Sequence, residues 1–70
     1  MAERNIEPGS RWRERDKRMR LRVVVVIEDD YFWVRIRTVR DEAGCEVTWA
    51  RATRVLRPSF LARFVEAGNG

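Results

Sequence analysis

The chain has 70 residues, which limits it to one small domain, and its three Trp, three Phe and one Tyr are enough large side chains for one core. Fifteen basic residues against eleven acidic ones give a net charge of +4, and Lys17 is the only basic residue that is not arginine. The absence of histidine and the single cysteine, Cys45, argue against catalytic triads, zinc sites and internal disulfides. We therefore expect a non-enzymatic protein of the cytoplasm, without metal or cofactor.

The N-terminal segment predicts an arm, a turn and a first strand. Residues 1–7 are mostly polar and indicate a flexible arm, so that residues 8–67 form the single domain. Pro8 and Gly9 predict a turn, and the alternation over residues 10–16 predicts a strand with Trp12 facing inward. The charged residues 16–19 predict a loop.

The strongest pattern lies in residues 20–39, where β-branched and aromatic residues on either side of Glu28, Asp29 and Asp30 predict a β-hairpin. We take Asp29 and Asp30 as the two turn residues. That register places one apolar set on the core face, namely Leu21, Val23, Val25, Ile27, Phe32, Val34 and Ile36, with Thr38. The opposite face then carries Arg22, Val24, Val26, Trp33, Arg35 and Arg37.

The next segment predicts a turn over residues 40–44 and a third long strand over residues 45–51. Its preferred register buries Val47 and Trp49 and sets Glu46 opposite Arg37. Cys45, at the strand start, is expected to be a small buried hydrophobic residue.

The C-terminal part admits two interpretations. In the favoured one, residues 53–56 form a short 3₁₀ turn and a last strand runs over residues 62–67. In the other, residues 59–66 form a helix laid over the sheet, capped by Ser59. Residues 68–70 indicate a frayed tail.

The features along the chain are the Pro8-Gly9 turn, the Trp12 strand with its arginines, a charged loop, Arg22 leading the valine run, the hairpin, Val55-Leu56, and Arg63-Phe64 at the end. This order of features resembles small SH3-like β-barrel proteins of the Tudor and KOW kind, found in actinobacteria and their phages. The resemblance implies an all-β, five-stranded SH3-like barrel with a short 3₁₀ turn before the last strand. It also implies binding of nucleic acid, peptides or host proteins.

Arginines interleaved with aromatic residues are typical of surfaces that bind the phosphate backbone of nucleic acids. The acidic hairpin tip opposes this interpretation, because it repels phosphate, and scattered arginines are also common on solvated strands. The alternative is a protein-interaction module, including one of phage origin that acts on a host protein, that uses the Trp33 and arginine face or a strand edge. No membrane partner is expected, and the chain would be a monomer or homodimer. The candidate binding residues for nucleic acid or a protein partner are Arg11, Arg13, Arg18, Arg20, Arg22, Tyr31, Trp33, Arg35 and Arg37.

Overall fold

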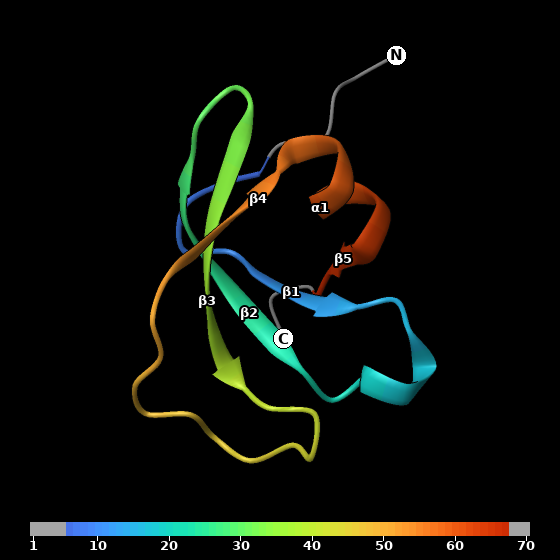
Figure 1. Cartoon of the computed structure of the whole chain (residues 1–70). Coiled ribbons are helices and arrows are strands. Elements are labelled where there is room, and N and C mark those ends of the chain that lie inside the picture. The colour runs from blue at the N-terminus through green and yellow to red at the C-terminus, as the bar shows by residue number, and fades with distance from the viewer. Residues whose placement is uncertain (1–5, 68–70) are drawn as a thin grey trace.

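The computed structural model describes residues 6–67, and most of this range is one antiparallel sheet (Figure 1). The five strands are β1 (Arg11–Glu14), β2 (Val23–Asp29), β3 (Trp33–Arg40), β4 (Thr53–Leu56) and β5 (Phe64–Glu66). A 3₁₀ helix, η1 (Lys17–Met19), separates β1 from β2, and a short helix, α1 (Arg57–Arg63), separates β4 from β5. The prediction of a five-stranded, essentially all-β fold is confirmed.

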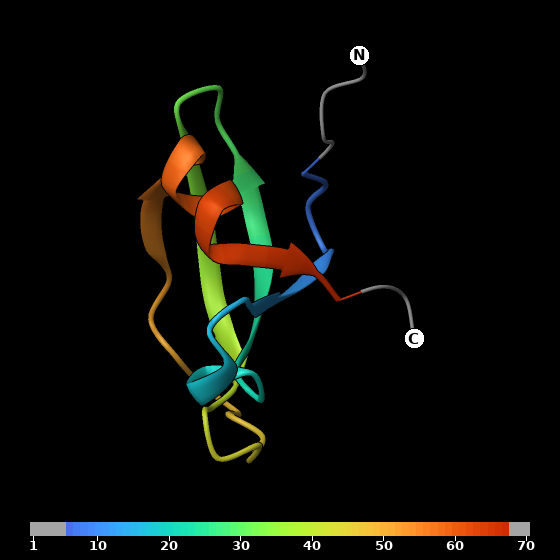
Figure 2. The same cartoon turned by 90° about the vertical axis from the view of Figure 1, so that its right-hand side faces the viewer.

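The strands lie in the order β4-β3-β2-β1-β5, so that β4 and β5 form the two edges. Within residues 6–67 these edges are not paired with each other, and the sheet does not close into the predicted barrel. Figure 2 shows β5 crossing in front of β2 and β3, with α1 above it on the same side. The helix therefore covers the region where pairing of the two edges would complete a barrel.

The core lies between the bent sheet and α1. Three aromatic side chains occupy its centre: the rings of Trp12 and Phe60 meet edge to face at 4.8 Å between centroids, and Phe60 stacks on Phe64 at 5.0 Å. Ile6, assigned from the sequence to the flexible arm, is only 4% exposed and belongs to this core; the other arm residues, 1–5, lie outside the described part. The remaining buried hydrophobic residues are Val24, Val26, Val34 and Ile36.

The turn at Pro8-Gly9 and the first strand agree with the prediction from the sequence. The backbone N–H of Ser10 donates to the carbonyl of Glu7 across the Pro8-Gly9 turn, and Gly9 adopts a positive φ of 91° that favours glycine. Strand β1 alternates exposed and buried residues, with Trp12 fully buried as predicted. The indole Nε1–H of Trp12 donates to Ser10 Oγ at 2.9 Å, which satisfies its polar group inside the core.

The hairpin exists, but the predicted register is wrong. Asp30 and Trp33 exchange backbone hydrogen bonds, so the connection is Tyr31-Phe32 rather than Asp29-Asp30. Val26 pairs with Ile36 and Val24 with Thr38, and a bulge at Ile27 shifts the pairing toward the turn. The core face therefore carries Val24 and Val26, predicted outside, whereas residues predicted inside are half-buried or exposed, namely Val23, Val25, Leu21, Ile27 and Phe32.

The physical reason is that the valine run is apolar on both faces, so either register buries Val34 and Ile36 of β3. A contact far along the chain favours the observed one. The carboxylate of Asp29 accepts hydrogen bonds from the guanidinium of Arg57, at the start of α1, at 2.5 and 2.6 Å. Asp29 is therefore a partner of the helix rather than a turn residue.

The strand predicted over residues 45–51 is reduced to one isolated bridge between Arg40 and Glu46. Trp49, predicted in the core, is 75% exposed, and Cys45 is exposed rather than buried. The predicted turn before them is present, since the backbone N–H of Gly44 donates to the carbonyl of Asp41. The partner of β3 is instead β4, whose residues were predicted to form a 3₁₀ turn.

Both interpretations of the C-terminus are correct in part. A helix is present, but it spans Arg57–Arg63 with Pro58 in its first turn, where the missing N–H costs nothing. A last strand follows it at once, because Phe64 is already extended and pairs with Glu14. Phe60 and Phe64 thus enter the core from a helix and a strand. Residues 68–70, predicted as a tail, lie outside the described part.

Candidate nucleic-acid interface

The face of the sheet turned away from the core carries five exposed arginines, which we call the outer basic face: Arg11, Arg13, Arg35, Arg37 and Arg54. The register places them together. Arg11 and Arg37 both pair with Val25, from the two sides of β2, and Arg35 pairs with Arg54 of β4. Paired residues project to the same side of a sheet, with Cβ atoms about 4.5–5.5 Å apart. Strands β1 to β4 therefore form one continuous surface. Its arginines lie on β1, β3 and β4, and the valines of β2 lie between them.

Few carboxylates neutralise this face. Its one ion pair within residues 6–67 joins Arg35 to Glu28 at 4.0 Å, and both side chains are more than half exposed. Arg11, Arg13 and Arg37 form no ion pair with any described residue. Glu46 lines a groove together with Arg11 and Arg40, but it forms no ion pair with either arginine. These guanidinium groups are therefore available to an external anion.

One aromatic side chain lies on the same face. Trp33, at the start of β3, is 37% exposed, and the guanidinium of Arg54 sits over its ring, 5.3 Å from the centroid. The two residues line a groove of about 370 Å³. Its other lining residues are Glu28, Asp30, Arg35 and Ala52.

Arg54 is not among the candidate residues of the sequence, because residues 53–56 are expected to form a 3₁₀ turn. The signal that points to it is the short β-branched stretch Thr53 to Val55, which fits a strand. The structure pairs this stretch with residues Val34 to Ile36 of β3. This pairing brings a fifth arginine onto the face that already carries Arg35 and Arg37.

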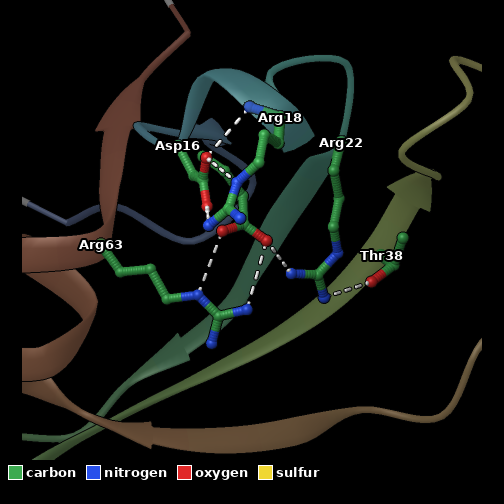
Figure 3. A network of polar contacts seen from close by, with 6 residues as sticks. Asp16, Arg18, Arg22, Thr38 and Arg63 are labelled. Carbon is green, nitrogen blue, oxygen red and sulfur yellow. Dashed lines mark hydrogen bonds and ion pairs between the residues drawn. The ribbon is translucent and has the colours of Figure 1, made fainter.

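Arg22, a predicted binding residue, does not lie on the outer basic face. Its side chain is only 20% exposed and donates to the carboxylate of Glu14 at 2.5 Å and to Thr38 Oγ1 at 3.0 Å (Figure 3). Arg63 approaches the same carboxylate from the end of α1, with Nε at 3.1 Å from Oε1. Glu14 is 2% exposed, so two arginines hold a buried charge and connect β1 to the residue before β2 and to the end of α1. Arg22 is therefore part of the folded framework.

The other candidates lie away from this face or at its margin. Arg18, in η1, is tied to the carboxylate of Asp16 at 3.1 Å, so its charge is partly compensated. Arg20 is exposed at the end of η1. Tyr31 is 79% exposed in the hairpin turn and meets Phe32 edge to face. The structure thus brings together Arg11, Arg13, Trp33, Arg35 and Arg37, and leaves Arg18, Arg20, Arg22 and Tyr31 apart from them.

Burial and the two arginines around it, Arg63 and Arg22, change the pKa of the Glu14 carboxyl group. Burial of Glu14 opposes its ionisation and is the largest single influence on its pKa. The hydrogen bonds and charges of Arg63 and Arg22 together outweigh it, so the pKa of Glu14 lies below its ordinary value of 4.5. A carboxyl whose pKa is lower in the folded state stabilises the fold above the unfolded pKa, and this contribution is lost as the pH falls through the folded pKa.

We expect the side-chain carboxyl carbon of Glu14 to titrate with a midpoint below pH 4.5 when it is followed by NMR. The urea midpoint of unfolding should lose the contribution of Glu14 as the pH falls below its ordinary pKa of 4.5 and through the Glu14 titration. A Glu14 midpoint at or above 4.5 would contradict the arrangement of Arg22 and Arg63 around it.

Two other kinds of functional feature, a metal site and a membrane-spanning helix, are absent from residues 6–67. No three His, Cys, Asp or Glu side chains within residues 6–67 gather closely enough to hold a metal ion. In the same range, no helix has the length and apolar character needed to cross a membrane. Comparison of the chain with protein-family models, curated proteins and solved structures found no match.

Proposed function

We propose that the protein is a small non-enzymatic binding module that binds nucleic acid through its outer basic face. The observation that carries this proposal is the gathering of five arginines on one face of the sheet with a single, long ion pair among them. Arginine donates two parallel hydrogen bonds to a phosphate, and it is weakly hydrated for a cation. A row of such groups on a rigid sheet suits a polyanion better than a single small anion.

Trp33 supports nucleic acid over other polyanions. An exposed aromatic ring beside arginines offers a surface on which bases stack, and stacking accepts every base because each has a π-face. The acidic groups nearest to it, Glu28 and Asp30, lie beside Arg35 and Arg54 at the hairpin end of the face, whereas Arg11, Arg13 and Arg37 pair with Val23 and Val25 of β2. The acidic hairpin tip therefore limits the binding surface on one side without cancelling it.

An SH3-like architecture is part of the same proposal. Strands β1 to β4 form a meander, and β5 returns to pair with β1 after the α1 segment. This strand order supports the resemblance, while the unpaired edges of β4 and β5 depart from a closed barrel.

The test is fluorescence anisotropy with a labelled single-stranded oligonucleotide of about 12 nucleotides, a length within the usual site sizes. At about 50 mM salt we expect binding that weakens steeply as salt is added. Arg37→Ala should weaken it about fivefold, which corresponds to roughly 1 kcal/mol for one charged contact. The slope of log K against log salt should fall by about 0.7 for each phosphate contact removed.

The matched control is Arg18→Ala, which removes the same charge from an exposed arginine that is already paired with Asp16. It should change the affinity by less than about twofold, since compensated charges contribute little to counterion release. Absence of binding at low salt would overturn the proposal. Equal losses in Arg18→Ala and Arg37→Ala would also contradict it, because they would show a general charge effect rather than a defined face.

A protein-interaction module is the second candidate, and exposed apolar side chains around the hairpin turn favour it. Phe32 is 64% exposed beside Tyr31, and Leu56, which pairs with Trp33, is 49% exposed. Contiguous apolar surface of this kind commonly marks an interface. Capture experiments with and without nuclease distinguish the two candidates: a protein partner retained after nuclease treatment, and released by Phe32→Ala, favours the second.

A further inference from the structure

The groove beside Trp33 has an ordered arrangement of charges. Two cross-strand rows form it. In one row the backbone pairing sets Asp30 beside Trp33, and in the next row on the same face it sets Glu28 beside Arg35 and Arg35 beside Arg54. The carboxylates thus come from β2 and its turn, the aromatic ring lies in the middle on β3, and an arginine comes from β4.

This arrangement suits a base rather than a phosphate. Two carboxylates repel a phosphate, but they accept hydrogen bonds from N–H groups. Two arginines opposite them donate to carbonyl or ring-nitrogen acceptors. With Glu28, Asp30, Arg35 and Arg54 the lining charges sum to zero, and a volume of about 370 Å³ is in the range of small-ligand sites. The groove therefore fits a neutral, flat group with donors on one edge and acceptors on the other.

Among the bases, guanine has this distribution. Its O6 and N7 are adjacent acceptors, and arginine commonly contacts both at once. Its N2 amino group is a donor that adenine, cytosine and thymine do not present at that position, and its N1–H lies beside it. Adenine and cytosine each offer a single amino donor, next to a ring acceptor that a carboxylate disfavours.

We propose that this groove binds an unpaired guanine of a single-stranded nucleic acid, stacked on Trp33. The carboxylates of Glu28 and Asp30 accept from its N1–H and N2 amino group, and Arg54 moves aside from the ring face to donate to its acceptor edge. The base must be unpaired, because in a duplex its ring faces are stacked and its N1–H is occupied. This inference rests on the proposed nucleic-acid binding and names the base that the site selects.

The experiment compares four labelled thymidine oligonucleotides of about 12 nucleotides. One is unsubstituted and the others carry a single central guanine, adenine or cytosine. We expect the guanine oligonucleotide to bind at least about fivefold more tightly than the other three, the lower end of what one bidentate base contact contributes. An oligonucleotide with inosine in place of guanine, which lacks the N2 amino group, should lose a large part of this preference.

The double variant Glu28→Gln/Asp30→Asn should abolish the preference while leaving binding to plain thymidine as tight as before or tighter, since two negative charges are removed. The control Glu42→Gln/Glu66→Gln removes the same charge from two exposed residues outside the groove and should retain the guanine preference. Equal affinities for all four oligonucleotides, with Arg37→Ala still weakening them, would overturn the guanine inference alone. Absence of binding to any of them would overturn the proposed function as well.

Discussion

Replacing Glu14 with alanine is expected to unfold much of the protein at room temperature. The carboxylate is 2% exposed and is shared by Arg22 and Arg63. Removing it leaves the guanidinium of Arg22, which is only 20% exposed, without its carboxylate, and breaking a buried ion pair in this way costs up to about 3–5 kcal/mol. A single core in a chain of this size rarely supplies more than about 3–5 kcal/mol in total, so the loss is comparable to the whole stability. Circular dichroism with urea unfolding measures it.

Alanine substitutions of Arg22 and Arg63 should lower the free energy of unfolding by different amounts. Arg22→Ala is expected to be more destabilising than Arg63→Ala, because the side chain of Arg22 is 20% exposed and that of Arg63 is 51% exposed and better screened by water. The control is Glu28→Ala, whose ion pair with Arg35 is long and exposed, and which should change stability by less than about 0.5 kcal/mol. A Glu14→Ala protein as stable as the Glu28→Ala protein would contradict the assignment of Glu14 as the buried carboxylate that holds Arg22 and Arg63.

Phe60→Ala is expected to have an effect of similar size. Phe60 is fully buried, with Trp12 on one side and Phe64 on the other. Truncating a buried phenylalanine to alanine costs about 3–5 kcal/mol, from lost burial and from the cavity left behind. Phe60 also holds α1 in place, because a helix of seven residues has little stability of its own in water. Loss of the near-ultraviolet circular dichroism of the tryptophans, of which Trp12 is the fully buried one, should accompany unfolding.

The matched control is Phe32→Ala, the same substitution at a position that is 64% exposed in the hairpin turn. It should change the free energy of unfolding by less than about 1 kcal/mol, since little apolar area is buried there. Phe60→Leu, which keeps most of the volume, should fold and lie between the two. Similar effects of Phe60→Ala and Phe32→Ala would contradict the placement of α1 over the core.

The candidate site was predictable only in part, because some of its residues come together only through strand pairing in the folded sheet. Arg35, Arg37 and Trp33 alternate with buried residues along β3, so the sequence pattern alone indicates one exposed basic row. Arg54 joins that row through the pairing of β4 with β3, across a connection of twelve residues between Arg40 and Thr53. Arg22 is an arginine like the others, but it lies just before β2 and contacts Glu14 of β1, eight residues away in the sequence. Pairings of this kind depend on the whole fold.

The sequence by itself determined that the fold is built mainly of antiparallel strands, that Trp12 is inward, and that the surface of β3 is basic. These conclusions follow from composition and from local alternation, which neighbouring residues decide. The tertiary structure alone decided the hairpin register, the partner of β3, the helix Arg57–Arg63, and the role of Glu14. The valine run fits either register, and only contacts between distant residues, such as Asp29 with Arg57, distinguish them.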